Sequence, residues 1–208
     1  PCLAEQAKIL VAEVEENNLG VEALQARWDR WSRCSLCEQQ YHGVVACALG
    51  WACWKTYVGR PEADETLGRA MTTLGNGLHY AGHKEDALTV HEAELSMLRR
   101  LGDSESNILI VQGNLAGTYG ELGQLEKALS MERDIYSGEL ELCGEENERT
   151  LISANNLAVT LNDLKRFEEA KPLLRKTMPV ARRVLGEGND VTLAMRWSYG
   201  QALYSDPG

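Results

Sequence analysis

A pattern of about 42 residues occurs three times along this 208-residue chain and then begins a fourth time. The end of each copy is marked by a glycine, and these glycines are spaced 42 residues apart: Gly102, Gly144 and Gly186. A period of this size is the signature of stacked helical repeats. Each repeat buries its apolar face only against its neighbours, so the pattern predicts an all-α solenoid, a class of protein that mostly binds other molecules.

The same residue types recur at fixed offsets inside each copy. A small residue is followed twelve positions later by an alanine, in the pairs Gly75/Ala87, Ala116/Ala128 and Ala158/Ala170. Small side chains at these points allow the two helices of a pair to approach closely. The turn between the helices holds Gly82 or Gly123 in the first two copies, and glycine suits the positive φ that commonly ends a helix. The third copy has Lys165 there, which predicts a modest cost.

These motifs read Leu-Gly/Ala-x-x-Leu/Tyr in the first helix and Gly-x-x-x-x-Ala between the helices, and the third copy opens its second helix with residues 167–174. They resemble the tetratricopeptide repeat, most closely the long-period kinesin light chain type, over residues 66–205. The resemblance implies a tetratricopeptide-type helical-repeat solenoid, a right-handed superhelix. We expect a helical, cysteine-rich cap over 1–60 and an array over 61–208, with three repeats and a closing helix at about 192–204.

Two prolines fall inside the second helix of the third copy. The resemblance tolerates Pro172, which lies near the helix start, where a missing N–H donor matters least. Pro179 is predicted to kink the helix or divide it, because a proline in a helix interior costs about 3 kcal/mol.

The net charge of −10 resides almost entirely in the array. Residues 1–60 hold six basic and seven acidic residues, which leaves −9 for residues 61–208. Binding to a phosphate backbone needs clustered Lys and Arg, so the composition argues against a nucleic-acid partner. It favours a basic peptide or protein, although the acidity can also serve only to solvate the surface. The longest nearly apolar run, 44–54, is too short to span a bilayer.

No catalytic motif is found. No Ser or Cys lies in a context such as G-x-S-x-G, and His79 and His83 lack a third ligand or an intervening glutamate. The sequence therefore predicts a non-catalytic protein.

The resemblance implies that a ligand peptide lies along the concave surface formed by the first helices. The positions expected to face it are rich in amides: Asn76, His79, Asn114, Asn155, Asn156 and Asn162. An asparagine amide can donate to and accept from a peptide backbone at once. For Asn114 and Asn156, bonding between helices is an equally good interpretation. Glycines at 113, 117 and 120 predict a shallow, bare stretch in the middle.

In the N-terminal segment, the spacing of apolar residues predicts a helix over 3–27 that is broken at 17–20. A second helix is predicted to begin after the break and run from 21 to 31, and an apolar helix is predicted over 46–57. Trp51, Trp54 and Tyr57 are expected to be buried against the first repeat.

The cysteines of this segment have three interpretations. Cys34, Cys37, His42 and Cys47 match the spacing of a zinc knuckle, although the residues between them lack the glycines and basic residues of knuckles that bind nucleic acid. Alternatively, the segment resembles the C-terminal half of a RING-type zinc finger of the RING-CH variety. That resemblance implies that Cys2 and the Cys34/Cys37 pair serve different zinc ions whose other ligands precede Pro1. Finally, the thiols can simply be packed in a helical cap.

Two functional classes follow. The first is a non-catalytic interaction module or scaffold that binds a peptide in its groove. The second is the substrate-recognition part of a RING-type ubiquitin ligase, or an adaptor with a zinc knuckle. A secreted disulfide scaffold would be shorter and richer in cysteine, so we expect reduced thiols and an intracellular, cytoplasmic protein. Zinc is expected to be absent or substoichiometric, because only the knuckle interpretation supplies four ligands.

Overall fold

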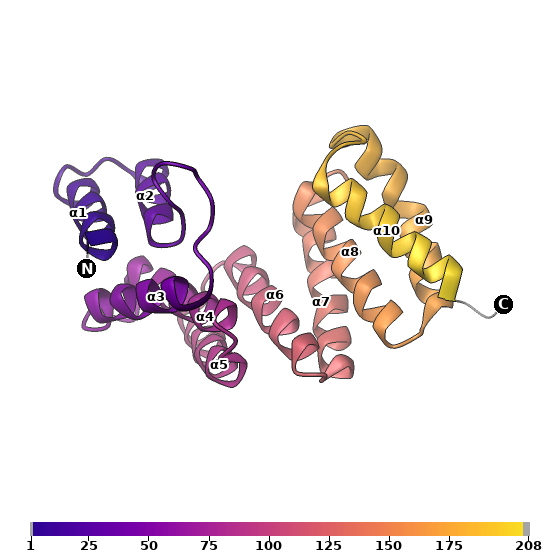
Figure 1. Cartoon of the computed structure of the whole chain (residues 1–208), viewed down its shortest axis with the longest axis horizontal. Coiled ribbons are helices and arrows are strands. Elements are labelled where there is room, and N and C mark those ends of the chain that lie inside the picture. The colour runs from indigo at the N-terminus through magenta and orange to yellow at the C-terminus, as the bar shows by residue number, and fades with distance from the viewer. Residues whose placement is uncertain (1, 206–208) are drawn as a thin grey trace. The chain divides into compact units, whose positions relative to one another are not determined.

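The structure is a computed structural model that describes residues 2–205, and the side chains of residues 3–205. Its contacts divide the chain into two compact units, and the division in sequence falls between Asp103 and Ser104. The first unit contains α1 (Cys2–Glu16), α2 (Val21–Trp28), the 3₁₀ helix η1 (Asp29–Trp31), α3 (Gly43–Tyr57), α4 (Glu65–Tyr80) and α5 (Lys84–Leu101) (Figure 1). The second contains α6 (Glu105–Glu121), α7 (Leu125–Cys143), α8 (Glu148–Asp163), α9 (Phe167–Val184) and α10 (Asp190–Ser205). Over residues 2–205 the only β pairing is an isolated bridge between Arg33 and Gln40, so the predicted all-α fold is confirmed.

The first helix of each copy begins at a residue whose side chain accepts a hydrogen bond from a backbone N–H of the first turn. Asp64 accepts from Thr66 before α4, and Asn147 accepts from Arg149 before α8, both at 2.9 Å. Ser104 caps α6 in the same way. Such caps satisfy N–H groups that have no partner inside the helix, so the boundaries of α4, α6 and α8 are encoded locally.

The turns between paired helices keep one geometry in all three copies. Gly82, Gly123 and Lys165 have φ values of 84°, 72° and 60°. The residue after each of them donates its N–H to the carbonyl five residues before it, and for Arg166 that acceptor is Leu161 at 2.8 Å. Lys165 therefore adopts the left-handed conformation that glycine adopts in the other copies, as the repeat register predicted.

The small residues of the repeat lie where paired helices are closest. A Cβ atom added to Gly75 would lie 2.3 Å from Cε1 of His91 on α5. Ala158 and Leu174, which lies sixteen residues later on α9, are fully buried in one cluster. The alanines twelve residues after the small positions, Ala87, Ala128 and Ala170, are also buried. The small residues that recur in the sequence are therefore the residues at which paired helices pack most closely.

The N-terminal segment shares its core with the first repeat. Trp28, Trp31, Cys53 and Tyr57 form one buried cluster with Ala70 of α4, and α1 contributes Ala7 and Val11 to it. Helices α3 and α4 approach closely at two glycines. A Cβ on Gly77 would lie 2.6 Å from the carbonyl oxygen of Ala46, and a Cβ on Gly50 would lie 3.0 Å from Cα of Leu74.

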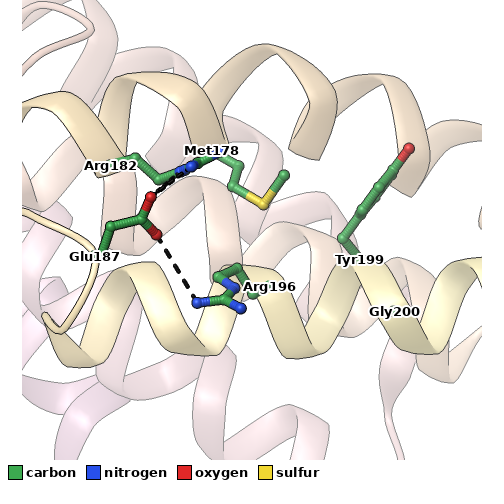
Figure 2. Close-up of a pocket in the computed structure, with 6 residues that line it drawn as sticks. All are labelled: Met178, Arg182, Glu187, Arg196, Tyr199 and Gly200. Carbon is green, nitrogen blue, oxygen red and sulfur yellow. Dashed lines mark hydrogen bonds and ion pairs between the residues drawn. The ribbon is translucent and has the colours of Figure 1, made fainter.

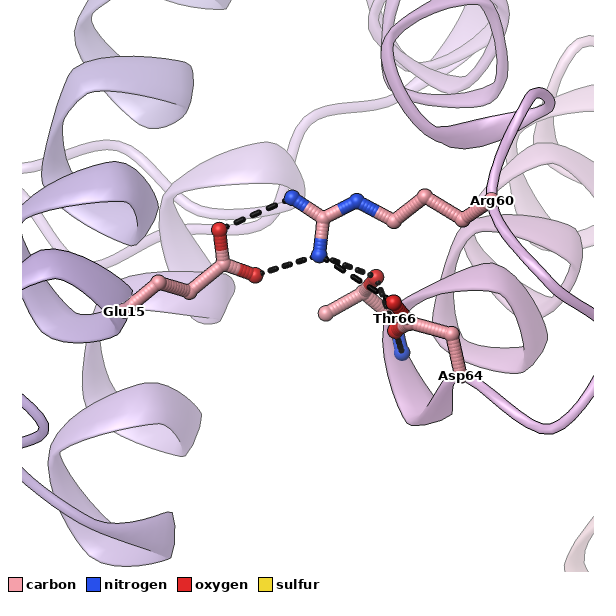
Figure 3. Close-up of polar contacts among 4 residues, drawn as sticks. All are labelled: Glu15, Arg60, Asp64 and Thr66. Atoms are coloured by element: carbon pink, nitrogen blue, oxygen red, sulfur yellow. Dashed lines mark hydrogen bonds and ion pairs between the residues drawn. The ribbon is translucent and has the colours of Figure 1, made fainter.

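Arg60 links α1 to the start of α4 (Figure 3). Its guanidinium donates to both carboxylate oxygens of Glu15, at 2.6 and 2.8 Å, and also to Asp64 and Thr66. The hydrogen bond to Glu15 raises the pKa of Arg60 above its ordinary value. A bidentate pair of this kind is geometrically specific, so it fixes the cap on the first repeat.

Three expectations about single residues differ from the structure or are refined by it. Trp51 is exposed, so its predicted burial is wrong: the buried stripe of α3 runs through Leu49, Gly50 and Cys53, and Trp51 falls outside it. Trp54 is partly buried and Tyr57 is buried, as expected. Pro179 does not divide α9, which is one helix from Phe167 to Val184. The buried side chains around this proline hold the helix against α8 and α10 despite the lost backbone donor.

Candidate peptide-binding surface

The first helices of the second unit each leave one face open. On α8 the exposed residues Ile152, Asn156, Val159 and Asp163 are spaced i, i+4, i+7 and i+11, which places them on one side of the helix. We call this set the α8 stripe. This side lies away from Ala158 and Leu161, which pack in clusters with α9.

The same positions of the preceding copy, 42 residues earlier, form an equivalent face on α6. Its members are Ile110, Asn114, Gly117 and Glu121, which are exposed except for the partly buried Asn114. We call them the α6 stripe. Each stripe therefore carries an apolar residue, an asparagine, a small or apolar residue and a carboxylate, in that order.

Arg149 holds the two first helices together near their N-terminal ends. Its guanidinium donates to Oγ of Ser106 on α6 at 2.7 Å and to Glu139 on α7 at 2.6 Å. Thr150 adds a hydrogen bond to the backbone carbonyl of Glu139. Side-chain hydrogen bonds thus link α6, α7 and α8 at one end.

Two of the predicted peptide-binding asparagines face a neighbouring helix instead. Asn162 is only 4% exposed, and its Nδ2 donates to the backbone carbonyl of Ser198 on α10 at 2.8 Å. Oδ1 of Asn155 accepts from Oγ of the same serine at 3.1 Å. The prediction that Asn162 faces a bound peptide is therefore wrong. These two residues, seven apart, lie on the side of α8 that packs against α10, and Asn155 is left only partly exposed.

Asn76 and His79 belong to the first unit, where α3 of the N-terminal segment packs against α4. The ring of Tyr80 has its centre 5.7 Å from that of His79 and 5.6 Å from that of His42, which precedes α3. Arg69, on the same helix, donates to Gln25 of α2 at 2.6 Å. Both Asn76 and His79 remain partly exposed, whereas the other four predicted residues lie in the second unit.

The candidate zinc ligands are not brought together. Cys34 and Cys37 share a tight turn in which the backbone N–H groups of Cys37 and Leu36 point to the Cys34 thiol and lower its pKa. Cys47, however, packs from α3 against the cluster that contains Leu74. Among the described residues no group of three or more His, Cys, Asp or Glu side chains is placed to hold a metal ion. The four-residue set Cys34, Cys37, His42 and Cys47 therefore does not fit a zinc knuckle, because these side chains are not grouped around one point and Cys47 packs, partly buried, on α3.

The remaining cysteines divide in the same way between core and surface. Burial raises the pKa of the Cys53 thiol far above its ordinary value, so Cys53 packs as an apolar residue. Cys143 is exposed at the end of α7. The side chain of Cys2, which the RING-type interpretation needed, lies outside the described side chains.

Sequence reasoning missed the isoleucines of the two stripes. Ile110 and Ile152 are exposed, yet an isoleucine in an amphipathic helix ordinarily indicates a buried position. The available signal was their recurrence at 42 residues together with Asn114 and Asn156.

Comparisons with known proteins agree with this repeat. The family model described as tetratricopeptide repeat matches residues 150–189, which cover α8 and α9. The fold is a tetratricopeptide-type helical repeat. A Podosopora anserina protein described as kinesin light chain-like, with nearly identical TPR-like repeats, has a similar structure, with a TM-score of 0.62 at 17% identity over 97% of this chain and 85% of that chain. A crystal structure of a variant of the same protein has a TM-score of 0.63.

BtubC (BKLC) from P. vanneervenii is also similar, with a TM-score of 0.59 and 19% identity. The alignment covers 77% of this chain and 62% of that chain, so this chain spans less than two thirds of that structure's length. None of the curated proteins matches the chain, and the comparisons give no support to a RING-CH finger. Tetratricopeptide-type repeats support a role as a protein–protein interaction scaffold, and the fold is typically non-catalytic. Among the described residues, no helix combines the length and apolar character needed to cross a membrane.

Proposed function

We propose that this protein is a non-catalytic interaction module that binds an extended basic peptide along the α6 and α8 stripes. The observation that carries this proposal is the recurrence of one exposed pattern on two first helices whose N-terminal ends are tied together by Arg149. A peptide that crosses both helices would meet the same residue types twice.

Each residue type of the stripes has a role in such a complex. Ile110 and Ile152 offer apolar contact to alternate side chains of the ligand. The amides of Asn114 and Asn156 can donate to and accept from its backbone. Gly117 leaves room for a bulky side chain, since among the described residues a Cβ added there would meet nothing within 4 Å beyond its chain neighbours and the nearby backbone of its own helix.

Charge favours a basic ligand. The stripes end in Glu121 and Asp163 and contain no Lys or Arg, and the array carries most of the net charge of −10. Complementary charge mainly accelerates association, so binding is expected to weaken as salt concentration rises, while the asparagines set the register of the peptide.

A peptide-library screen against the purified chain tests the proposal. It is expected to return basic ligands whose affinity falls in the double variant Asn114→Ala/Asn156→Ala. Loss of about one hydrogen bond at each site is worth about 2 kcal/mol together, or roughly thirtyfold in Kd. Asn17→Ala removes an exposed amide from the first unit and is expected to leave Kd unchanged. Equal affinity of the parent and the double variant would show that the ligand binds elsewhere.

A further inference from the structure

Glu132 of α7 carries a buried carboxyl group that has no partner. Only 5% of the residue is exposed, and among the described residues no hydrogen bond or ion pair reaches its carboxyl group. Both carboxyl oxygens nevertheless keep some contact with solvent. Burying a carboxylate without a partner costs free energy, so this group is poised to pair with a cation that arrives from outside the chain.

Two other carboxylates of the second unit are paired with arginine. Glu139 lies on the same helix, is only 4% exposed and accepts from Arg149 at 2.6 Å. Glu187 lines a pocket between α9 and α10, where it accepts from Nε of Arg182 at 2.7 Å (Figure 2). Among the described residues, the chain thus supplies a cation to each of these carboxylates and none to Glu132.

Glu132 lies on α7 between the contacts that this helix makes with α6 and with α8. Ile135 packs in one cluster with Ala116 of α6, and Leu129 packs in another with Leu157 of α8. Glu132 is three residues from both Leu129 and Ile135, so its direction around the helix axis is midway between theirs. The carboxyl group therefore lies on the side of α7 that faces the space between α6 and α8.

The equivalent space between α8 and α10 is filled by side chains. Asn155 and Asn162 of α8 both bond to Ser198 of α10, and Leu174 of α9 is fully buried there. The residues 42 positions before Asn155, Asn162 and Leu174 are Gly113, Gly120 and Glu132.

The space between α6 and α8 is open by comparison. Among the described residues, a Cβ added to Gly113 or Gly120 would meet nothing within 4 Å beyond its chain neighbours and the nearby backbone of its own helix. The direct packing that joins α8 to α10 has no counterpart between α6 and α8 over the described part of the chain. This space therefore lacks the asparagines of the next one, and the residue beneath it is a glutamate in place of a leucine.

We propose that a lysine of the bound peptide inserts its side chain between α6 and α8, where its ammonium group pairs with Glu132. The proposal rests on the peptide-binding function proposed above and names the basic residue that the surface selects. The stem of the lysine passes Gly113 or Gly120 while the peptide backbone contacts Asn114 and Asn156. A lysine suits this space better than an arginine, because its ammonium is a compact charge on a slender stem, whereas a planar guanidinium brings five donors.

No charged side chain among the described residues competes for this position. Burial is the only cause that raises the pKa of Glu132, to about 7. On α7, the neighbouring cation Arg133 is bonded to Glu169 at 2.6 Å. The titratable groups of the two helices packed on α7 all lie in a first or last turn: Glu105, Tyr119, Glu121, Glu148, Arg149 and Asp163. A lysine of the ligand would therefore be the first cation to reach this carboxyl group.

A short peptide of alternating lysine and threonine is the probe, because threonine favours an extended chain. Its matched control carries acetyl-lysine, which keeps the stem and removes the charge. With a pKa of about 7, the ionised fraction of Glu132 rises roughly tenfold from about pH 6 to about pH 8. Fluorescence anisotropy is expected to show the affinity of the lysine peptide rising about tenfold over this range, because only the ionised form is competent to bind it. The acetyl-lysine peptide is expected to bind equally at both pH values.

Protein variants place the lysine between α6 and α8. Glu132→Gln is expected to weaken binding of the lysine peptide about tenfold at about pH 8 and to abolish its pH dependence. Glu141→Gln removes the same charge from an exposed position of the same helix and is expected to bind like the parent. Gly113→Leu fills the open space and is expected to weaken binding, whereas Gly200→Leu adds the same side chain at an open position of α10 and is expected to leave binding unchanged.

The n-butylammonium ion has the stem and charge of a lysine side chain and tests the site without a peptide. The carboxyl carbon resonance of Glu132 is assigned by its loss in Glu132→Gln and followed against pH by NMR. Addition of n-butylammonium chloride is expected to lower the midpoint of this titration, since an opposite charge favours the ionised form. Sodium chloride at the same concentration is expected to leave the midpoint in place.

Two results would overturn the proposal. The first is a midpoint that n-butylammonium does not move, and the second is equal, pH-independent binding of the lysine peptide by the parent and Glu132→Gln. If Asn114→Ala/Asn156→Ala weakens binding of both peptides but Glu132→Gln weakens neither, the stripes bind the peptide and Glu132 has no part in it. If n-butylammonium moves the midpoint but the parent binds neither peptide, the ammonium site is supported and the peptide-binding function of the stripes is wrong.

Discussion

The positions that matter most at the scale of single residues are those where a small residue of the repeat meets a polar side chain in the core. His91 is buried against Gly75, and its Nδ1 lies 3.4 Å from Glu94, which in turn accepts a hydrogen bond from Thr72 of α4. In the second copy the residue sixteen positions after Ala116 is Glu132, also buried. The third copy has Leu174 there. One structural position thus carries an imidazole, a carboxyl group and an alkyl group.

Gly75→Ala is expected to destabilise the protein by about 1–3 kcal/mol, because its Cβ would overlap the His91 ring and force repacking of a filled core. Gly200→Ala makes the same change at the equivalent position of α10, where the space is open. It is expected to be neutral or to stabilise by about 0.5–1 kcal/mol through helix propensity. Denaturant unfolding measures both, and equal effects of the two substitutions would contradict the assigned packing.

Glu132 makes stability depend on pH. Burial raises the pKa of its carboxyl group to about 7, whereas in an unfolded chain a glutamate titrates near about 4.3. The folded state therefore holds the proton more tightly than the unfolded state. The associated stability is fully present below about pH 4.3 and is lost as the pH rises through about 7.

Glu132→Gln removes this dependence. The variant is expected to match the parent near about pH 4 and to exceed it near about pH 8, by an amount on the order of 1–3 kcal/mol. Urea midpoints measured at the two pH values provide the comparison. If the stability difference between the parent and the variant were the same at both pH values, Glu132 would not be buried as a neutral acid.

Among the helices, packing within each pair and the turn that joins the pair follow one plan in three copies. The caps at Asp64, Ser104 and Asn147 start the first helices, and positive φ at Gly82, Gly123 and Lys165 ends them. The alanine of the second helix then lies against the first helix. One side of α8 is covered by the next first helix: Asn155 and Asn162 both bond to Ser198 of α10.

Ala128→Leu tests the packing of a pair. Ala128 is 1% exposed on α7, so the larger side chain has no space, and overpacking is expected to cost about 1–3 kcal/mol. Thermal unfolding of the variant should show a lowered midpoint. A melt identical to that of the parent would mean that α6 and α7 do not approach each other at this residue.

At the scale of the whole molecule, contacts group the chain into two compact units, divided after Asp103; the repeat pattern predicts a cap over 1–60 and an array over 61–208. The cysteine-rich N-terminal helices share a hydrophobic cluster with α4, and the unit that contains them extends to Asp103. The second unit holds the proposed peptide-binding surface, the α6 and α8 stripes.

Zinc is expected to be absent or well below one ion per purified chain, because the Cys34/Cys37 turn supplies two thiols and Cys47 packs against the cluster that contains Leu74. Metal analysis by mass spectrometry measures this directly. One tightly held zinc per chain that is lost in Cys34→Ser, but kept in the control Cys143→Ser, would contradict the expectation and show that the turn acquires further ligands.

The sequence by itself determined the repeat, the helices and their register. The repeat period, the spacing of small residues and the turn residues each reflect a steric requirement within one helix pair. For this reason the roles of Gly75, Ala128 and Lys165 in helix packing and turns could be predicted from the sequence. The resemblance to the tetratricopeptide repeat predicted that the first helices face a ligand, and Asn114 and Asn156 lie at positions that the structure leaves at least partly exposed.

Only the tertiary structure decided which side of each helix is left for a ligand. Asn155 and Asn156 are neighbours in sequence and similar in chemistry, yet one bonds to Ser198 and the other is exposed. Periodicity places residues around a helix, but it does not tell which sector the next helix covers. For the same reason Cys47 was considered as a metal ligand but packs, partly buried, against the cluster that contains Leu74, and Trp51 was expected to be buried but is exposed.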